Sequence, residues 1–255
     1  MVDMRKYRRF LSSDDWEIYS QKEHPSDLQL KVPPPPIEKP FPDDARLIDL
    51  VLPDQLSVGR APLLDVIRRR ESRRKFMSEP LGFEELSFLL WATQGIRNVT
   101  DQDGRPLRSY RTVPSGGGRH ALETYLVISR VTGLAPGLYR YLPIEHKLLP
   151  LRKDHDLADR IAKASYEQTF IKDGAVIFIW TTIPYRAEWR YSIAAHKMIL
   201  LDAGHVCQNL YLAAEAIGAG TCAIAAYRQK PLDELIGVDG EDEFVMYLAP
   251  VGRLA

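Results

Sequence analysis

Cysteine is scarce in this chain, and long apolar runs are missing. The 255 residues include only Cys207 and Cys222, which excludes a disulfide framework and a cysteine-based metal cluster. Both lie among small apolar neighbours, so we expect buried free thiols in a cytoplasmic protein. No stretch approaches the ~18 apolar residues that suggest a membrane span. The basic N-terminus lacks the apolar run of a secretory signal, so we expect no membrane association.

Net charge is also missing. The chain has 34 basic and 34 acidic residues, so no overall field draws it to nucleic acid or to an anionic membrane. Its six histidines include no i, i+4 pair with an intervening glutamate. His196 and His205 fall on opposite sides of a predicted helix, and we expect no metal ion. No Gly-x-Ser-x-Gly motif supports an α/β-hydrolase.

Proline, in contrast, is concentrated near the start. Pro33 to Pro36 form a run of four, followed by Pro40, Pro42 and Pro53. Such a segment favours polyproline II and cannot pair as a central strand. We expect residues 1–57 to form an arm that wraps the surface or a partner subunit, with a flexible linker as the alternative. Residues 58–255 would then form the main domain.

The remaining chain alternates strand-like and helix-like segments. A helix is expected to start near Ala61 with Pro62 in its first turn, and Leu63, Leu64, Val66 and Ile67 supply its buried side. Further helices are expected at Phe83–Ala92 and around Leu157–Ser165, and a long one at Ser192–Ile217. The long helix is apolar on more than one side, as in a core or a subunit interface. Strands are expected at Thr124–Ser129, Leu138–Leu142, Ala175–Thr182 and Phe244–Ala249. This pattern indicates an α/β or α+β domain.

Three segments carry residue types suited to binding chemistry. Arg68–Arg74 is either a solvated charged face or an anion clamp, because guanidinium groups match phosphate oxygens. Arg111–His120 holds three consecutive glycines, whose amides can converge on an anion or a planar ring; a flexible hairpin loop is the alternative. Gly218–Tyr227 is rich in small residues that admit a flat group, or simply make a tight connection. None is a Walker A or Rossmann motif.

Four motifs in order resemble the nitroreductase superfamily, specifically its SagB/ThcOx-like branch of FMN-dependent dehydrogenases. These are Arg70-Glu-Ser72-Arg-Arg74-Lys-Phe76, Gln94-Gly95, Pro114-Ser115-Gly116-Gly117, and the helix from Asp202 that leads into Gly218–Tyr227. The resemblance spans residues 60–253. It implies an α+β sandwich with a central, mostly antiparallel sheet flanked by helices. It also implies a homodimer formed through the long helix, with FMN at each interface.

The resemblance also implies roles for individual residues. Arg70, Ser72 and Arg74 would hold the FMN phosphate and ribityl chain, with Arg253 as a second phosphate candidate. Gln94 would touch the pyrimidine edge. The ring would be lined from one subunit by Pro114, Ser115, Gly116 and Gly117, and from the other by Ala223, Ile224, Ala225 and Ala226, with a backbone N–H near flavin N5.

Two departures from the family pattern affect the chemistry. Many members have Pro-Ile-Gly or Pro-Ile-Glu where this chain has Ala223–Ala226, which preserves a backbone contact but not a carboxylate contact. Some azoline-oxidising members carry Lys-Tyr where this chain has Arg190-Tyr191. Arginine stays protonated and cannot shuttle protons, so Tyr191 is the catalytic candidate, with ordinary packing as the alternative.

The function expected is an FMN-dependent oxidoreductase that transfers hydride between a nicotinamide or organic donor and an acceptor through flavin N5. NAD(P)H would bind only transiently, and the substrate would be a small molecule or a peptide. One alternative is a flavin-binding scaffold without turnover, or the flavin subunit of a peptide-modifying, azoline-oxidising complex. Another is an anion- or nucleic-acid-binding protein that uses Arg68–Arg74, which the neutral overall charge disfavours.

Overall fold

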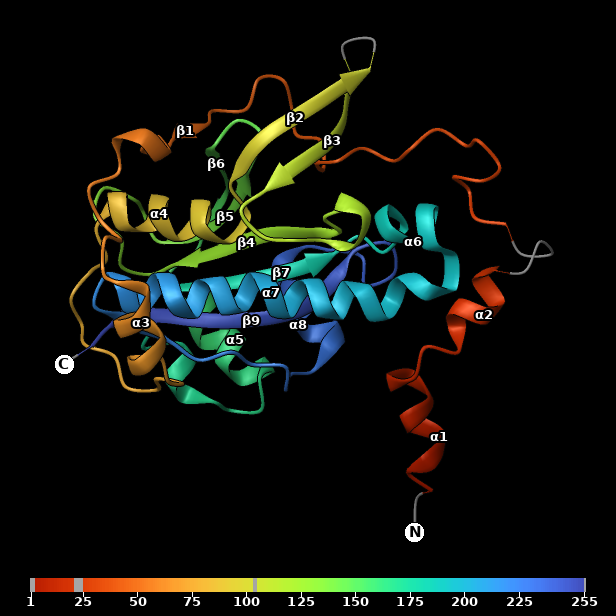
Figure 1. The fold of residues 1–255 in the computed structure, drawn as a ribbon. Coiled ribbons are helices and arrows are strands. Elements are labelled where there is room, and N and C mark those ends of the chain that lie inside the picture. The colour runs from red at the N-terminus through yellow and green to blue at the C-terminus, as the bar shows by residue number, and fades with distance from the viewer. Residues whose placement is uncertain (1–2, 21–24, 103–104, 255) are drawn as a thin grey trace.

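The computed structural model describes residues 3–20, 25–102 and 105–254, and its centre is a seven-stranded sheet (Figure 1). The strand order is β1-β6-β5-β4-β7-β9-β8, and every pairing between neighbours is antiparallel. The strands are β1 Ile48–Asp49, β4 Leu122–Ile128, β5 Gly137–Leu142, β6 Lys147–Lys153, β7 Val176–Thr182, β8 Ala219–Thr221 and β9 Phe244–Arg253. The predicted α+β class with a mostly antiparallel sheet is confirmed.

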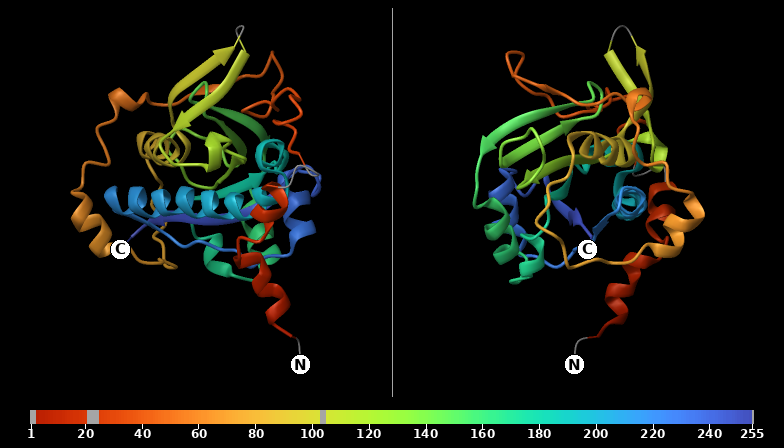
Figure 2. Two further views of the ribbon diagram at one scale, coloured as in Figure 1. Left: turned by 45° about the vertical axis from the view of Figure 1, so that its right-hand side comes forward. Right: turned by 90° about the vertical axis from the view of Figure 1, so that its left-hand side faces the viewer.

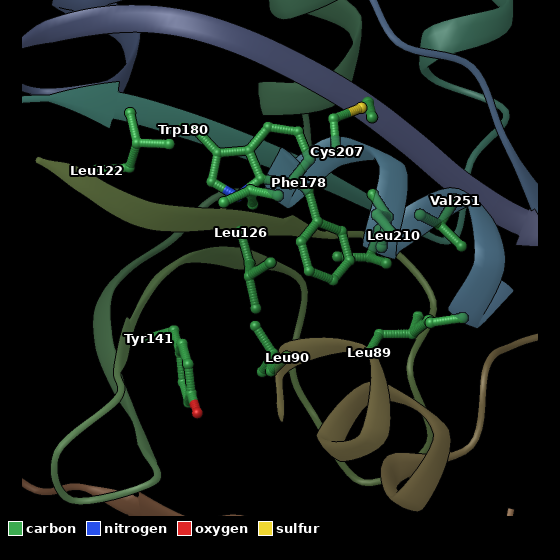
Figure 3. Packing of buried hydrophobic residues seen from close by; sticks show 14 of the residues in the cluster. Leu89, Leu90, Leu122, Leu126, Tyr141, Phe178, Trp180, Cys207, Leu210 and Val251 are labelled. Atoms are coloured by element: carbon green, nitrogen blue, oxygen red, sulfur yellow. The ribbon is translucent and has the colours of Figure 1, made fainter. Parts of the chain in front are cut away.

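Both faces of the sheet are covered by helices because its central strands are apolar on both sides. Phe178 and Trp180 of β7 pack in the cluster beneath α4 (Phe83–Gln94) and α7 (Ala195–Ala216) (Figure 3). Ile177 and Ile179 join the opposite cluster beneath α5 (Leu157–Ala164) and α8 (Gln229–Ile236). This alternation is the period of two that a strand imposes. The continuous apolar run predicted for this strand reflects coverage on two faces.

The long helix begins later than the sequence predicted. The segment before it forms α6 (Tyr185–Tyr191) and a 3-10 turn at Ser192–Ala194, and α7 starts at Ala195. Ser192 has a φ of 46°, which interrupts the helix between α6 and α7. The helical segment predicted from about Ser192 therefore opens with this 3-10 turn and becomes α-helical at Ala195, and the predicted end at Ile217 agrees with the helix cap there. Cys207 and Cys222 are buried free thiols, as predicted.

The proline-rich segment packs on its own chain. Proline has no backbone N–H, but its carbonyl and its neighbours' carbonyls can accept hydrogen bonds. Buried arginines supply the donors: Arg186 Nε donates to Pro36 O at 3.0 Å, and Arg140 Nη2 donates to Lys39 O at 2.8 Å. Further along, β1 pairs with β6 at the edge of the sheet.

Before this segment the arm forms short helices, α1 (Arg5–Arg8), a 3-10 turn at Arg9–Leu11 and α2 (Asp15–Ser20), while a second 3-10 turn at Pro53–Gln55 follows β1. A hairpin, β2 (Ile96–Gln102) with β3 (Arg105–Arg111), stands away from the sheet (Figure 1). The sequence did not predict this hairpin, because its strands have no alternating apolar face.

Helix α3 (Leu63–Arg69) corrects another expectation. Only Val66 is buried, while Leu63, Leu64 and Ile67 are 63%, 59% and 54% exposed. The predicted buried side of this helix is wrong for the single chain, because α3 lies on the outer side of α7, away from the sheet (Figure 2). Leu200 and Leu201 of α7 are also exposed. Both α3 and α7 therefore carry exposed apolar side chains.

Across the described residues, no helix combines the length and apolar character needed to cross a membrane.

Candidate functional site

The segment after α3 brings the three predicted phosphate residues to the edge of the sheet. The backbone of Ser72 forms a parallel β-bridge with Thr221 of β8, and Arg73 N donates a hydrogen bond to Thr221 O at 2.9 Å. The Ser72 hydroxyl contacts Tyr211 of α7, and the Arg73 side chain reaches Glu215 one turn further along the same helix. Arg73 forms salt bridges with Glu71 and with the buried Glu215. One arginine of the run is therefore structural.

Arg70 and Arg74 differ from Arg73 in their surroundings. The Arg70 guanidinium lies 5.4 Å from the centre of the Tyr211 ring, and that of Arg74 lies 5.8 Å from the Phe170 ring. No described carboxylate pairs with either of them. Aromatic faces support guanidinium groups without consuming their in-plane donors. Together with the Ser72 hydroxyl, they offer charged and neutral donors that an oxyanion needs.

Tyr211 connects this group to the small-residue segment. Its hydroxyl lies 3.0 Å from Ser72 Oγ and accepts a hydrogen bond from Ala223 N at 2.8 Å. We call Arg70, Ser72, Arg74 and Tyr211 the arginine cluster. The sequence placed Tyr211 only among the apolar positions of the long helix. The only feature of the sequence that could have pointed to Tyr211 as a site residue was its hydroxyl, on a helix otherwise rich in aliphatic residues.

The backbone of Ala223–Ala226 is only partly available. Ala223 N donates to Tyr211, and Ile224 N donates to Leu248 O at 2.8 Å. Ala225 and Ala226 are exposed, and no hydrogen bond from their N–H groups occurs within the described part of the chain. The resemblance implies that a backbone N–H of Ala223–Ala226 lies near flavin N5. Of these four residues, only Ala225 and Ala226 have an N–H group that is not already donated within the described chain.

The glycine loop, Pro114–Gly118, lies beside α6 and α7. Gly116 N donates to both carboxylate oxygens of Asp202 at 3.1 and 3.2 Å, and His120 N donates to Ser115 Oγ at 2.9 Å. Burial raises the pKa of Asp202, while the bonds from Ser115 and Gly116 oppose that shift. The carboxylate thus fixes the loop from the long helix. The sequence did not single out this role of Asp202.

Gly117 is required by both conformation and space. Its φ is 60°, and a Cβ there would lie 2.4 Å from the Tyr191 hydroxyl and 2.8 Å from Arg190 Nε. Real Cβ atoms do not approach that closely, so only glycine permits this packing. Gly117 therefore brings the loop backbone against the Arg190-Tyr191 pair.

Tyr191 is held from two sides. Its ring makes an edge contact with Trp16 of α2 at 5.8 Å and a tilted contact with Tyr19 at 6.3 Å. Tyr19 also donates to the Arg190 carbonyl at 3.2 Å. The ring is thus a packing element, while the hydroxyl faces the glycine loop. The structure places the catalytic candidate beside the predicted ring-lining residues.

Gln94 and Arg253 make internal contacts. Gln94 is buried; it accepts from Arg111 Nη1 at 3.0 Å and lies behind the glycine loop with Val113 and Pro114. Arg253 Nη2 donates to Glu85 Oε2 at 2.6 Å, and its Nη1 donates to Ile217 O at 3.1 Å. The arginine therefore neutralises a carboxylate and caps the end of α7.

The two groups of site residues lie at separate places on α7. Tyr211 belongs to the arginine cluster and Asp202 holds the glycine loop, nine residues apart on the same helix. That spacing corresponds to about 13.5 Å of rise and about half a turn of rotation. A single chain therefore presents the two halves on different sides of its longest helix.

The sheet, the long helix and these motifs define a member of a flavoprotein fold class, and sequence comparison gives the family. Residues 67–253 match the nitroreductase family. A Methanocaldococcus jannaschii protein described as a nitroreductase is 32% identical over 206 residues, which cover 81% of this chain and 96% of that protein. The chain belongs to the nitroreductase family.

Further relatives differ in how much they share. The trifolitoxin-processing protein TfxB of Rhizobium leguminosarum bv. trifolii is 30% identical over 116 residues, covering 42% of this chain and 30% of TfxB. A Ralstonia eutropha nitroreductase structure has a TM-score of 0.66 at 27% identity and covers 88% of this chain and 99% of its own.

Two more distant structures share the fold. A chain of the Escherichia coli microcin synthetase McbBCD complex has a TM-score of 0.60 at 16% identity and covers 98% of this chain and 91% of its own. The NADPH:FMN oxidoreductase of Vibrio harveyi, complexed with NAD+, has a TM-score of 0.52 at 17% identity. The match covers 75% of this chain and 68% of the Vibrio harveyi chain. At such low identity these two likenesses show the fold alone.

Proposed function

We propose that this protein is an FMN-dependent oxidoreductase that works as a homodimer. One observation carries the proposal: the arginine cluster and the glycine loop are both preformed, yet they occupy different sides of α7. A two-fold dimer packed through this helix would place the cluster of one subunit beside the loop of the other. The exposed Leu63, Leu64, Ile67 and Leu201 supply the apolar surface that such packing would bury.

The residues of the arginine cluster fit a flavin phosphate. Arg70 and Arg74 carry charge that no described carboxylate balances, and Ser72 adds a hydroxyl. We assign these three to the phosphate and ribityl chain. Arg253 is fully engaged with Glu85 and Ile217, so in this proposal it supports the end of β9 and α7 instead of holding phosphate.

The hydrogen bonds of the glycine loop and of Ala223–Ala226 also suggest which residues would face the flavin ring. Pro114 to Gly117 would line the ring from one subunit, with Gln94 and Asp202 behind the loop. Ala225 or Ala226 would supply the backbone donor from the other subunit, because Ala223 and Ile224 already donate elsewhere.

When bound, FMN supplies hydride transfer chemistry, and the protein orients the reactants. Tyr191 is placed to donate a proton to the substrate, since its hydroxyl lies against the glycine loop. Its neighbour Arg190 would orient an anionic group of the substrate. NAD(P)H is proposed as a transient reductant, and the buried free thiols suit a cytoplasmic protein.

A visible spectrum followed by steady-state assay tests the proposal. The purified protein is expected to be yellow, or to become so on reconstitution with FMN, and then to consume NADH or NADPH in the presence of a quinone or nitroaromatic acceptor. A colourless protein that cannot be reconstituted would contradict it. Bound FMN without turnover on any donor would instead favour a flavin-binding scaffold.

A second candidate is the flavin subunit of a peptide-modifying complex. The similarity to TfxB favours it, since that relative is named for processing trifolitoxin. The test is to incubate the FMN-loaded protein with an azoline-containing peptide and to follow the peptide mass. Loss of one hydrogen molecule per ring supports the candidate. An unchanged mass, with active NAD(P)H oxidation, supports a stand-alone oxidoreductase.

A further inference from the structure

Three arginines converge on the glycine loop. Arg190 Nε lies against Gly117, and Arg108 Nε lies near Gly118, whose added Cβ would be 3.9 Å from it. The Cα atoms of these glycines are about 3.8 Å apart, so both guanidinium groups face one short stretch of backbone. Arg119, directly after the loop, is buried and lies 4.7 Å from the centre of the Trp189 ring. We call Arg108, Arg119 and Arg190 the loop arginines.

The nearby carboxylates are engaged elsewhere. Glu123 pairs with Arg186 at 2.6 Å, Glu188 with His196 at 2.7 Å, and Asp202 accepts the Gly116 N–H. No salt bridge to a loop arginine occurs between side chains that the structure describes. Arg119 Nε donates to the Arg186 carbonyl at 2.8 Å, and its buried Nη2 has no partner among the described groups. The cluster therefore holds uncompensated positive charge.

The electrostatics agree with this geometry. Burial, together with the neighbouring Arg190, Arg108 and Arg186 cations, lowers the pKa of Arg119 to about 10. Burial, with Arg111 as the main neighbouring cation, lowers the pKa of His120 to about 2, so this imidazole adds no charge. Like charges gathered beside a cavity favour an anion that satisfies them together.

A cavity is present at this position. It has a volume of about 250 Å³ at the foot of the β2–β3 hairpin, and its lining includes Arg108, Ser115, Gly117 and Gly118. The Tyr191 hydroxyl and the Arg190 side chain both lie against Gly117 of the same loop. A ligand in the cavity would thus touch Ser115, Gly117 and Gly118 and, of the loop arginines, Arg108, while Arg190 lies against Gly117 outside the lining and Arg119 follows Gly118.

We propose that the loop arginines form a subsite for an oxyanion group, a carboxylate or a phosphate, carried by the molecule that exchanges electrons at the glycine loop. Planar guanidinium groups bind both oxyanions through paired, charge-assisted hydrogen bonds. The substrate class is therefore anionic. The idea that the bound anion is oxidised or reduced rests on the proposed function. Binding of the anion to the loop arginines can be measured without turnover.

The test is calorimetric titration of the FMN-loaded protein with benzoate, phenyl phosphate and the uncharged benzamide. At least one of the two anions is expected to bind ten or more times tighter than benzamide, and whichever binds tighter identifies carboxylate or phosphate. Arg108→Gln and Arg190→Gln should each weaken the anion roughly 10- to 100-fold and leave benzamide unchanged. Arg160→Gln, the same charge change on α5 across the sheet, is the matched control.

The subsite would be overturned if benzoate, phenyl phosphate and benzamide bind the wild-type protein equally tightly. It would also be overturned if Arg108→Gln and Arg190→Gln both keep the wild-type preference for the anions. In titrations of the flavin-free proteins, loss of the anion preference in Arg70→Ala alone would also overturn it, because the anion would then occupy the arginine cluster. Melting curves of the variants establish that they fold. If the protein takes up no FMN, the same titrations on the flavin-free protein separate failure of the proposed function from failure of the subsite.

Discussion

At the scale of single residues, hydrogen-bonding capacity decides which side chains are structural and which are available. Arg73 forms salt bridges with Glu71 and Glu215. The guanidinium groups of Arg70 and Arg74 instead lie over aromatic rings, and no described carboxylate pairs with them. Tyr211 holds Ser72 and Ala223 at one hydroxyl. The arginine run itself could be singled out from sequence. The role of Tyr211 could not, because it depends on where α7 crosses two segments remote in sequence.

Loss of either Arg70 or Arg74 is expected to release FMN. Arg70→Ala or Arg74→Ala removes charge-assisted hydrogen bonds to phosphate, at about 1.5–3 kcal/mol apiece, while the fold remains intact. FMN titration followed by fluorescence measures the affinity, and thermal denaturation checks the fold. Arg68→Ala, an exposed arginine two positions earlier, is the control. Unchanged affinity in both variants would show that the phosphate lies elsewhere.

Tyr211→Phe tests the connection between the two segments. The ring under Arg70 remains, but the hydrogen bonds to Ser72 and Ala223 disappear, each worth about 1 kcal/mol. We expect FMN affinity to fall about five- to tenfold. Tyr110→Phe, on the exposed β2–β3 hairpin, should bind FMN normally. A wild-type dissociation constant for the Tyr211 variant would remove Tyr211 from the site.

At the scale of elements, the sequence predicted those segments whose pattern reflects burial within one chain. β7 lies within the predicted Ala175–Thr182 because it is covered on both faces. The hairpin β2–β3 was missed because it stands off the core and its strands are polar. The buried side of α3 was wrong because apolar residues at helical spacing do not reveal whether their cover belongs to the same chain.

Gly117→Ala is expected to disrupt the glycine loop. The new Cβ would meet the Tyr191 hydroxyl and Arg190, in addition to the ~1–2 kcal/mol cost of a positive φ. Gly133→Ala is a matched control, since Gly133 has a φ of 84° with open space around it. Comparing the melting temperatures and turnover of both variants separates backbone strain from the clash. Equal effects in both would mean that the loop tolerates displacement.

The attachment of the proline-rich segment should depend on pH. Burial, together with Glu145, raises the pKa of Glu38 to about 8, although the Ile144 N–H donates to its carboxyl at 3.2 Å. The folded state therefore keeps a proton that the unfolded chain releases at lower pH. The stability from this proton is present below the ordinary glutamate pKa and is lost as pH rises through about 8.

Glu38→Gln cannot lose that proton. Its free energy of unfolding relative to wild type should therefore rise between pH 5 and pH 9, by up to about 4 kcal/mol for a pKa raised from 4.5 to about 8. Urea denaturation at several pH values measures the difference. A difference that is constant across this range would place the carboxyl in an ordinary, solvated environment.

At the scale of the whole molecule, the two halves of the site and the exposed apolar surface lead to the same assembly. Leu201 of α7 is 55% exposed, and Leu64 of α3 is 59% exposed. Leu201→Glu should therefore weaken the dimer and, with it, FMN binding. Sedimentation velocity measures the assembly. Leu151→Glu, at a 42% exposed leucine of β6, is the control. A wild-type protein that is monomeric yet fully loaded with FMN would refute the shared site.

The central claim is that each chain contributes half of two FMN sites. Size-exclusion chromatography with simultaneous absorbance and light scattering tests it most directly. We predict a yellow dimer with one FMN per chain, and a colourless but folded Arg70→Ala protein. A wild-type protein that elutes without flavin after reconstitution, or an Arg70→Ala protein with undiminished flavin, would contradict the claim.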